Sequence, residues 1–117
     1  MSSKLLEVLK DFECAGHALS EARRRLIAAR LVYQREMARV ADRIFKDPER
    51  NGFAFGEVVT YKKINILLQA DEAITLAAGL VSDAKRTVVI CQTEYFYQKE
   101  RLECQRVITS ASLSRTS

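Results

Sequence analysis

The side chains best suited to metal binding or nucleophilic catalysis are one histidine and three cysteines. Cys14 and His17 stand three positions apart, so on a helix both could reach one point in space. A tetrahedral metal site needs two further ligands, and neither Cys91 nor Cys104 stands at a spacing typical of such a site. We therefore expect no metal and no cofactor, and we interpret His17 as an ordinary surface residue.

Motifs for catalysis are also missing. A single histidine leaves little scope for a Ser-His-Asp arrangement, and the sequence contains no Gly-x-Ser-x-Gly. There is no glycine-rich phosphate loop, and the acidic residues are spread singly rather than clustered as a magnesium site requires. We therefore expect a protein that is not an enzyme.

A run of basic residues could bind an anionic partner. Residues 23–35 contain five arginines and no acidic residue, and the whole chain has a net charge of +4. Guanidinium groups hold phosphates and carboxylates with paired hydrogen bonds. One interpretation is a solvated face that pairs with acids of a second helix, such as Glu72 and Asp83. The other is a surface for nucleic acid or an acidic protein, formed by Arg23, Arg24, Arg30 and Arg35.

These residues belong to a predicted first helix of about residues 3–46, with Ser3 as its N-cap. Large residues recur every seven positions, and small ones follow three positions later, which is a heptad pattern. The large residues are Leu5, Phe12, Leu19, Leu26, Tyr33 and Val40, and the residues that follow the first four are Val8, Ala15, Ala22 and Ala29.

A turn over residues 47–56 should end this helix, because Pro48, Asn51-Gly52 and Gly56 favour turns. We expect Phe53 and Phe55 to fold back onto the helices. A second helix of about residues 57–108 repeats the heptad pattern, and we favour its continuity through Gly79–Asp83 because the register does not change there. The tail 109–117 has no periodicity and should be frayed. The second set of heptad residues is Leu67, Ile74, Val81, Val88, Tyr95 and Leu102, with the smaller Ala70, Ala77, Ala84 and Cys91.

The two helices match when Leu26 is placed opposite Ala77. A large residue then faces a small one in nearly every layer, as when Phe12 faces Cys91, and the hinge falls between Asn51 and Gly52. The sequence therefore predicts an all-α fold. It is a long, coiled-coil-like antiparallel helical hairpin that forms a single domain of residues 1–117.

More apolar residues remain than one hairpin can bury. The Tyr95-Phe96-Tyr97 triplet covers three adjacent directions, so Phe96 and Tyr97 should face outward when Tyr95 is in the core. We expect such a surface to be covered. Two interpretations are open, and both can hold at once: two hairpins pair as a four-helix bundle, and another protein docks on part of this surface. The candidate residues for partner binding are Ile90, Phe96, Tyr97, Leu76 and Leu80.

These features predict a non-enzymatic helical protein that binds other proteins, of the regulator, inhibitor or chaperone and adaptor type found in bacteria and phages. The alternative is a small basic bundle that binds RNA or DNA. The most apolar stretch, residues 64–81, contains Asn65, Gln69, Asp71 and Glu72, so we expect no membrane span. The first residues lack the apolar segment of a secretory signal, so we expect a cytoplasmic protein. From the surplus of apolar residues we expect it to be a homodimer.

Overall fold

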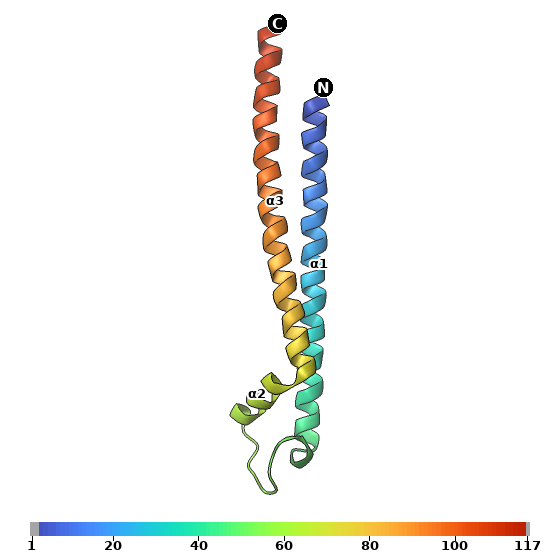
Figure 1. Cartoon of the computed structure of the whole chain (residues 1–117), viewed down its shortest axis with the longest axis vertical. Helices are drawn as coiled ribbons and strands as arrows, with labels where there is room; N and C mark the ends of the chain where they lie inside the picture. The colour runs from blue at the N-terminus through green and yellow to red at the C-terminus, as the bar shows by residue number, and fades with distance from the viewer. Residues whose placement is uncertain (1–2, 117) are drawn as a thin grey trace. The chain divides into compact units, whose positions relative to one another are not determined.

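The computed structural model describes residues 3–116, and the fold is all-α. Helix α1 spans Ser3–Lys46, the short 3-10 helix η1 spans Glu49–Asn51, α2 spans Tyr61–Ala70, and α3 spans Glu72–Thr116 (Figure 1). Helix α1 has the same bounds as the predicted first helix. The expected all-α, hairpin-like fold is confirmed.

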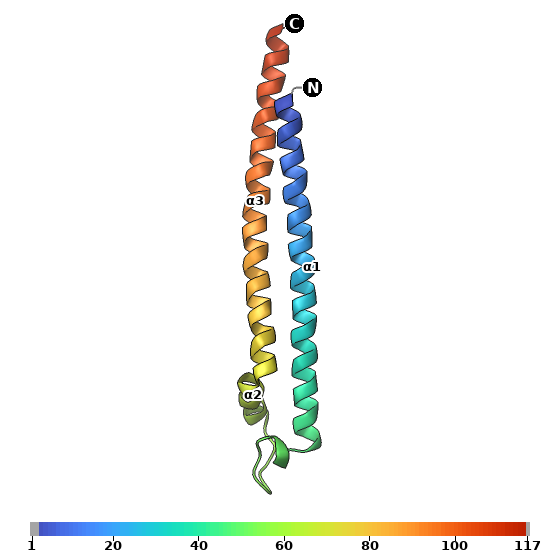
Figure 2. The same ribbon diagram turned by 45° about the vertical axis from the view of Figure 1, so that its right-hand side comes forward.

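The chain forms two compact units. Unit 1 contains Met1–Arg25 and Lys85–Ser117, and unit 2 contains Leu26–Ala84. Within each unit, segments of α1 and α3 lie side by side and run in opposite directions (Figures 1 and 2). Unit 2 also holds η1, α2 and the loops that join them. The single domain of residues 1–117 stays a prediction.

The predicted heptad residues line the core. Val8, Leu19 and Leu102 are among the buried ones, and every other member is buried or half-buried except Ala70, which is exposed. The large-and-small pattern therefore identified the buried face of both long helices correctly, since apolar residues at this spacing share one face of a helix.

One contact in unit 1 differs from the predicted layers. The ring of Tyr95 lies 5.2 Å from the ring of Phe12, centroid to centroid, whereas the sequence placed Phe12 opposite Cys91. A Cβ added at Gly16 would lie 3.8 Å from the Tyr95 ring. Side chains on a helix lean toward its N-terminus, so the Tyr95 ring leans toward the start of α3 and packs against the Phe12 ring.

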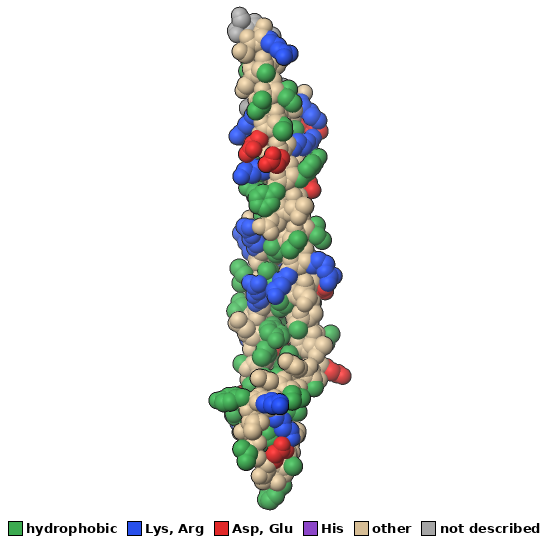
Figure 3. All heavy atoms as spheres, turned by 90° about the vertical axis from the view of Figure 1, so that its left-hand side faces the viewer, with side chains coloured by type: hydrophobic (Ala, Val, Ile, Leu, Met, Phe, Trp, Pro, Cys, Tyr) green, Lys and Arg blue, Asp and Glu red, His purple; other side chains and the backbone are tan. Residues whose placement is uncertain are grey.

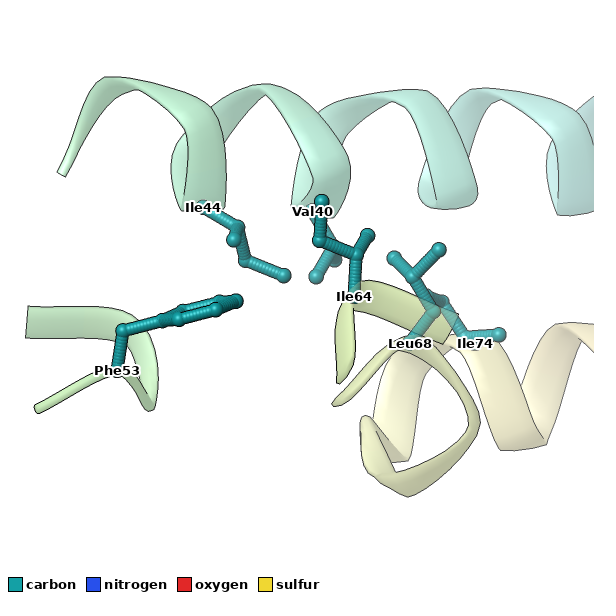
Figure 4. Packing of buried hydrophobic residues seen from close by; sticks show 6 residues of the cluster. All are labelled: Val40, Ile44, Phe53, Ile64, Leu68 and Ile74. Carbon is teal, nitrogen blue, oxygen red and sulfur yellow. The ribbon is translucent and has the colours of Figure 1, made fainter. Parts of the chain in front are cut away.

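Unit 2 has a core built from all of its segments. Val40 and Ile44 of α1, Phe53 of the turn, Ile64 and Leu68 of α2, and Ile74 of α3 point toward one another (Figure 4). Phe53 is 4% exposed, so the expectation that it folds back is confirmed. The same expectation is wrong for Phe55, which is 91% exposed, because the chain turns at Gly56 with a φ of 75° and carries Phe55 away from the core.

The predicted helix 57–108 is wrong in its start and in its continuity. Helix α2 begins at Tyr61, with the Thr60 hydroxyl accepting a hydrogen bond from the Lys63 N–H at 3.3 Å. At Asp71 the backbone becomes extended, with φ −72° and ψ 129°, and α2 and α3 meet at a bend of 74°. The Asp71 carboxylate then accepts a hydrogen bond from the Ile74 N–H at 3.1 Å, which caps α3.

The break explains why Ala70 is exposed. The bend turns α2 so that Ile64 and Leu68 enter the core of unit 2, and Ala70 leaves the predicted seam. The continuity expected through Gly79–Asp83 is confirmed, because α3 runs through these residues. The frayed tail is wrong for residues 109–116, which complete α3; no glycine or proline interrupts them, and Gln105 donates a hydrogen bond to the Thr109 hydroxyl at 3.5 Å. Residue 117 of that tail lies outside the described residues.

Candidate protein-binding surface

The residues considered for metal binding or catalysis are not gathered into one site. Cys14 and Cys104 are exposed, Cys91 is half-buried, and His17 lies on the surface. In residues 3–116, no group of three His, Cys, Asp or Glu side chains is placed to hold a metal ion. Over the same range, every buried side-chain nitrogen or oxygen has a hydrogen-bond partner.

The five residues predicted to bind a partner are all exposed on α3. In unit 1, the exposed fractions are 63% for Ile90, 53% for Phe96 and 60% for Tyr97. In unit 2, Leu76 is 72% exposed and Leu80 is 57% exposed. Figure 3 shows hydrophobic side chains at the surface beside Lys and Arg. Large apolar side chains are therefore left in solvent in both units.

Phe96 belongs to an aromatic groove in unit 1. This groove has a volume of about 470 Å³ and runs between α1 and α3. The ring of Phe96 meets the ring of Tyr95 edge to face, with centroids 5.9 Å apart, and Tyr95 in turn contacts Phe12. Gly16 has no side chain to fill the groove, and its other lining residues are Glu13, His17, Leu19, Ser20, Arg23 and Gln92.

Ile90 belongs to a different groove of the same unit. This second groove, of about 480 Å³, has Ala15 and Ala18 from α1 and residues 89–91, Thr93 and Glu94 from α3 as its lining. Tyr97 stands seven residues after Ile90 and so shares its face of α3. Phe96 and Ile90 therefore line different grooves, whereas the sequence suggested that they belong to one hydrophobic cluster.

A polar cluster near Gln98 was not predicted. Arg101 donates a hydrogen bond to the Asp11 carboxylate at 2.7 Å, which joins α3 to α1 within unit 1. The pKa of Arg101 is raised, chiefly because of this hydrogen bond. Gln98 is buried, with its amide donating to Glu94 at 2.8 Å and its carbonyl accepting from Arg101 at 3.3 Å. The sequence contained one sign of this cluster, because the polar residue Gln98 stands on the face of the second predicted helix that was expected to pack against the first.

The arginines of α1 fall into two groups. Arg25 pairs with Glu21 at 3.4 Å and Arg39 pairs with Glu36 at 2.7 Å. Arg23 and Arg24 in unit 1, and Arg30 and Arg35 in unit 2, are exposed and form no ion pair with any residue that the structure describes. Their guanidinium groups are therefore solvated and available to an anionic partner, and none of the four forms the ion pairs with Glu72 or Asp83 that one interpretation expected.

The loop before α2 places further apolar side chains in solvent, and of these only Phe55 was considered from the sequence. Phe55, Val58 and Tyr61 are exposed, and Phe45, Val59, Tyr61 and Ile64 line a small pocket of about 240 Å³ in unit 2. The loop is held by Glu57, which accepts hydrogen bonds from the Lys63 ammonium at 2.6 Å and the Ala54 N–H at 2.9 Å. These bonds lower the pKa of Glu57.

Taken singly, none of the helices described here is both long and apolar enough to cross a membrane. Helices α2 and α3 meet that criterion only as a pair bent by 74°, and only in length and composition. No family model matches the chain, and neither the curated proteins nor the solved structures include a significant match.

Proposed function

We propose that this chain is a non-enzymatic, cytoplasmic helical protein that acts by binding other proteins, as a regulator, an inhibitor or a chaperone or adaptor. The observation that carries the proposal is the exposure of large apolar residues on α3, with Ile90, Phe96 and Tyr97 each more than half exposed. Soluble proteins rarely leave such surface uncovered unless it binds a partner. Aromatic side chains are the residues most often responsible for binding energy at interfaces.

Self-association is part of the proposal. The groove beside Ile90 is floored by Ala15 and Ala18, whose small side chains allow a second helix to approach closely. A second copy that places its own Ile90 and Tyr97 against this floor would complete a four-helix bundle with a two-fold contact. Both copies would then bury residues that are exposed in the single chain.

A second candidate function is binding of RNA or DNA. It is supported by the predicted residues Arg23, Arg24, Arg30 and Arg35, which are four of the exposed arginines of α1 that have no ion-pair partner among the described residues. Phosphate binding weakens steeply as salt rises, because counterions compete for the phosphates. A salt titration therefore separates this candidate from binding through apolar residues.

The experiment that tests the proposal is affinity capture from the native host with the tagged chain and two matched sets of variants. Phe96→Ala and Tyr97→Ala each remove an apolar anchor, and at a central interface position this costs about 2 kcal/mol or more of binding free energy. Reversal of Arg23 and Arg24 to Glu should mainly change the association rate and its salt dependence.

Each variant must keep its helical circular dichroism signal and its oligomeric mass, because these aromatic residues would also hold a dimer together. If the arginine variant alone loses the captured partner while its fold is intact, protein binding through α3 is the wrong function and nucleic-acid binding takes its place.

A further inference from the structure

We infer that one face of α1 in unit 2 binds an acidic amphipathic helix of another protein. The apolar residues of this face, which we call the α1 stripe, are Ile27, Leu31, Ala38 and Phe45; the polar Gln34 lies on the same face, seven positions after Ile27. The inference rests on the proposed function, that the chain binds proteins, and it specifies the chemistry of one partner and the surface that receives it.

The spacing of the four residues places them on one side of the helix. They are separated by four, seven and seven positions, which are the intervals that return to the same face. All four are exposed, and the exposed fractions of Ile27, Leu31 and Phe45 are 58%, 49% and 54%. The stripe is distinct from the buried seam of α1, to which Val40 and Ile44 belong.

The length of the stripe suits a helix. At a rise of 1.5 Å per residue, residues 27–45 extend for about 27 Å, which is the length of a partner helix of roughly 18–20 residues. The Phe45 end opens into the pocket of about 240 Å³ that Val59, Tyr61 and Ile64 also line. This pocket can take one large apolar side chain at the end of the bound helix.

The charge beside the stripe determines the character of the partner. Arg30 comes three positions after Ile27 and Arg35 comes four positions after Leu31, so at about 100° per residue they lie on opposite flanks. Both are exposed and have no ion-pair partner among the described residues. The acids of α1 in this unit are Glu36 and Asp42, and each already has a cation, Arg39 at 2.7 Å and Lys46 at 2.9 Å.

A helix with acidic residues beside its apolar anchors would therefore pair with both arginines while it covers the stripe. A second copy of this chain fits less well. In a two-fold contact each stripe would meet its own counterpart, which would bring Arg30 and Arg35 of one copy close to the arginines of the other. Helix α3 has no excess of acidic over basic residues to offer in their place.

A nucleic acid also fits less well. Its phosphates would neutralise Arg30 and Arg35, but a duplex backbone offers no apolar surface to cover Ile27, Leu31 and Phe45. Burial of these side chains adds favourable free energy only when the partner is apolar at the same positions.

The test uses the purified full chain and a fluorescein-labelled helical peptide of about 20 residues, in which leucines repeat at heptad spacing and glutamates flank them. A second peptide has lysine at every glutamate position. Fluorescence anisotropy should show binding of the acidic peptide, and Arg30→Glu combined with Arg35→Glu should weaken it by roughly tenfold or more and favour the lysine peptide. Leu31→Ser should also weaken binding of the acidic peptide.

Arg43→Glu is the matched control, because Arg43 is exposed and has no ion-pair partner among the described residues. It comes five positions after Ala38, which places it about 140° around α1 from the stripe. This substitution should change the affinity by less than about twofold. Equal binding of the two peptides, no binding of the acidic peptide, or no effect of the double reversal would overturn the inference.

Tight binding of duplex RNA that the double reversal abolishes, without peptide binding, would also overturn it and assign the arginines to nucleic acid. The capture experiment with Tyr97→Ala reports on α3 separately. If the peptide fails while capture through Tyr97 persists, the inference about the stripe is lost and the proposed function stands.

Discussion

The ion pair between Asp11 and Arg101 joins α1 to α3 within unit 1, at a distance of 2.7 Å. Both side chains remain partly in solvent, with exposed fractions of 44% for Asp11 and 28% for Arg101. Pairs of this kind contribute little to stability, because water screens the charges and two flexible side chains must be fixed.

We therefore predict a coupling free energy below about 1 kcal/mol from a double-mutant cycle with Asp11→Asn and Arg101→Gln, measured by urea denaturation. Additivity of the two single changes within this limit is the expected result. A coupling of several kcal/mol would mean that the pair is shielded from solvent, for example at an interface between copies.

Glu57 makes the loop before α2 sensitive to acid. Its pKa is lowered below the ordinary value of 4.5, mainly because the carboxylate accepts a hydrogen bond from Lys63. A lowered pKa in the folded state means that the ionised form stabilises the loop. This contribution is fully present above the ordinary pKa and is lost as the pH falls through the lower, folded-state pKa.

We expect the Ala54 amide, which donates to Glu57 at 2.9 Å, to show this transition in an NMR titration between pH 6 and pH 2.5. Glu57→Gln is the control and should remove the transition of that amide. A titration midpoint for Glu57 above its ordinary pKa would contradict the assignment.

Many of the buried residues could be predicted from residue types and their spacing alone. The heptad spacing identified Val8, Ala22 and Leu102 as buried, because period and burial are directly linked on a helix. The spacing did not predict the contact of Tyr95 with Phe12, because that contact depends on the direction in which the Tyr95 side chain leaves the helix. It also did not predict the hydrogen bond between Asp11 and Arg101, because these residues are 90 positions apart in the chain.

At the scale of elements, the break between α2 and α3 is the main feature that periodicity missed. Leu67 and Ile74 are seven positions apart and continue the heptad, so their spacing alone predicts one helix. The competing signals are Asp71, which caps α3 with its carboxylate, and the burial of Ile64 and Leu68 against α1. The outcome depends on tertiary packing, which no short window of sequence contains.

Asp71→Ala should cost about 1 kcal/mol of unfolding free energy, within the range of about 0.5–2 kcal/mol found for N-cap residues. Thermal or urea denaturation followed by circular dichroism measures this cost. Asp71→Asn is the matched control, because an asparagine side chain can cap the helix almost as well. An alanine variant as stable as the original chain would show that packing alone sets the break.

Two substitutions on α3 should act in opposite directions. Ala77 is buried at 3% exposure, so Ala77→Leu should overpack unit 2 and lower the unfolding free energy by about 1–3 kcal/mol. Gly79 lies in the same helix, and a Cβ added there meets nothing within 4 Å, so Gly79→Ala should raise stability by up to about 1 kcal/mol. If Ala77→Leu were neutral, Ala77 would not be a tightly packed core residue.

At the scale of the whole molecule, the sequence predicted the all-α hairpin-like fold and the exposure of the candidate residues on α3. It did not show that Phe96 and Ile90 line different grooves, since that depends on how Gly16 and Ala18 are placed opposite them. The uncovered apolar surface now motivates the proposals of dimerisation and of protein binding.

We expect sedimentation velocity at micromolar concentration to give about twice the monomer mass of 13.3 kDa. Ala18→Glu should lower that mass to the monomer value, because it places a charge on the floor of the groove beside Ile90. A clean monomer of the original chain at high concentration would exclude the four-helix bundle and leave the groove to another protein.

The central claim is that the exposed face of α3 binds protein. The most direct measurement is photo-crosslinking in the native host, with benzoylphenylalanine in place of Tyr97 and, as a control, in place of the exposed Lys10 of α1. We expect a protein adduct larger than 13.3 kDa from position 97 and little or none from position 10. An adduct with nucleic acid, or equal adducts from both positions, would contradict it.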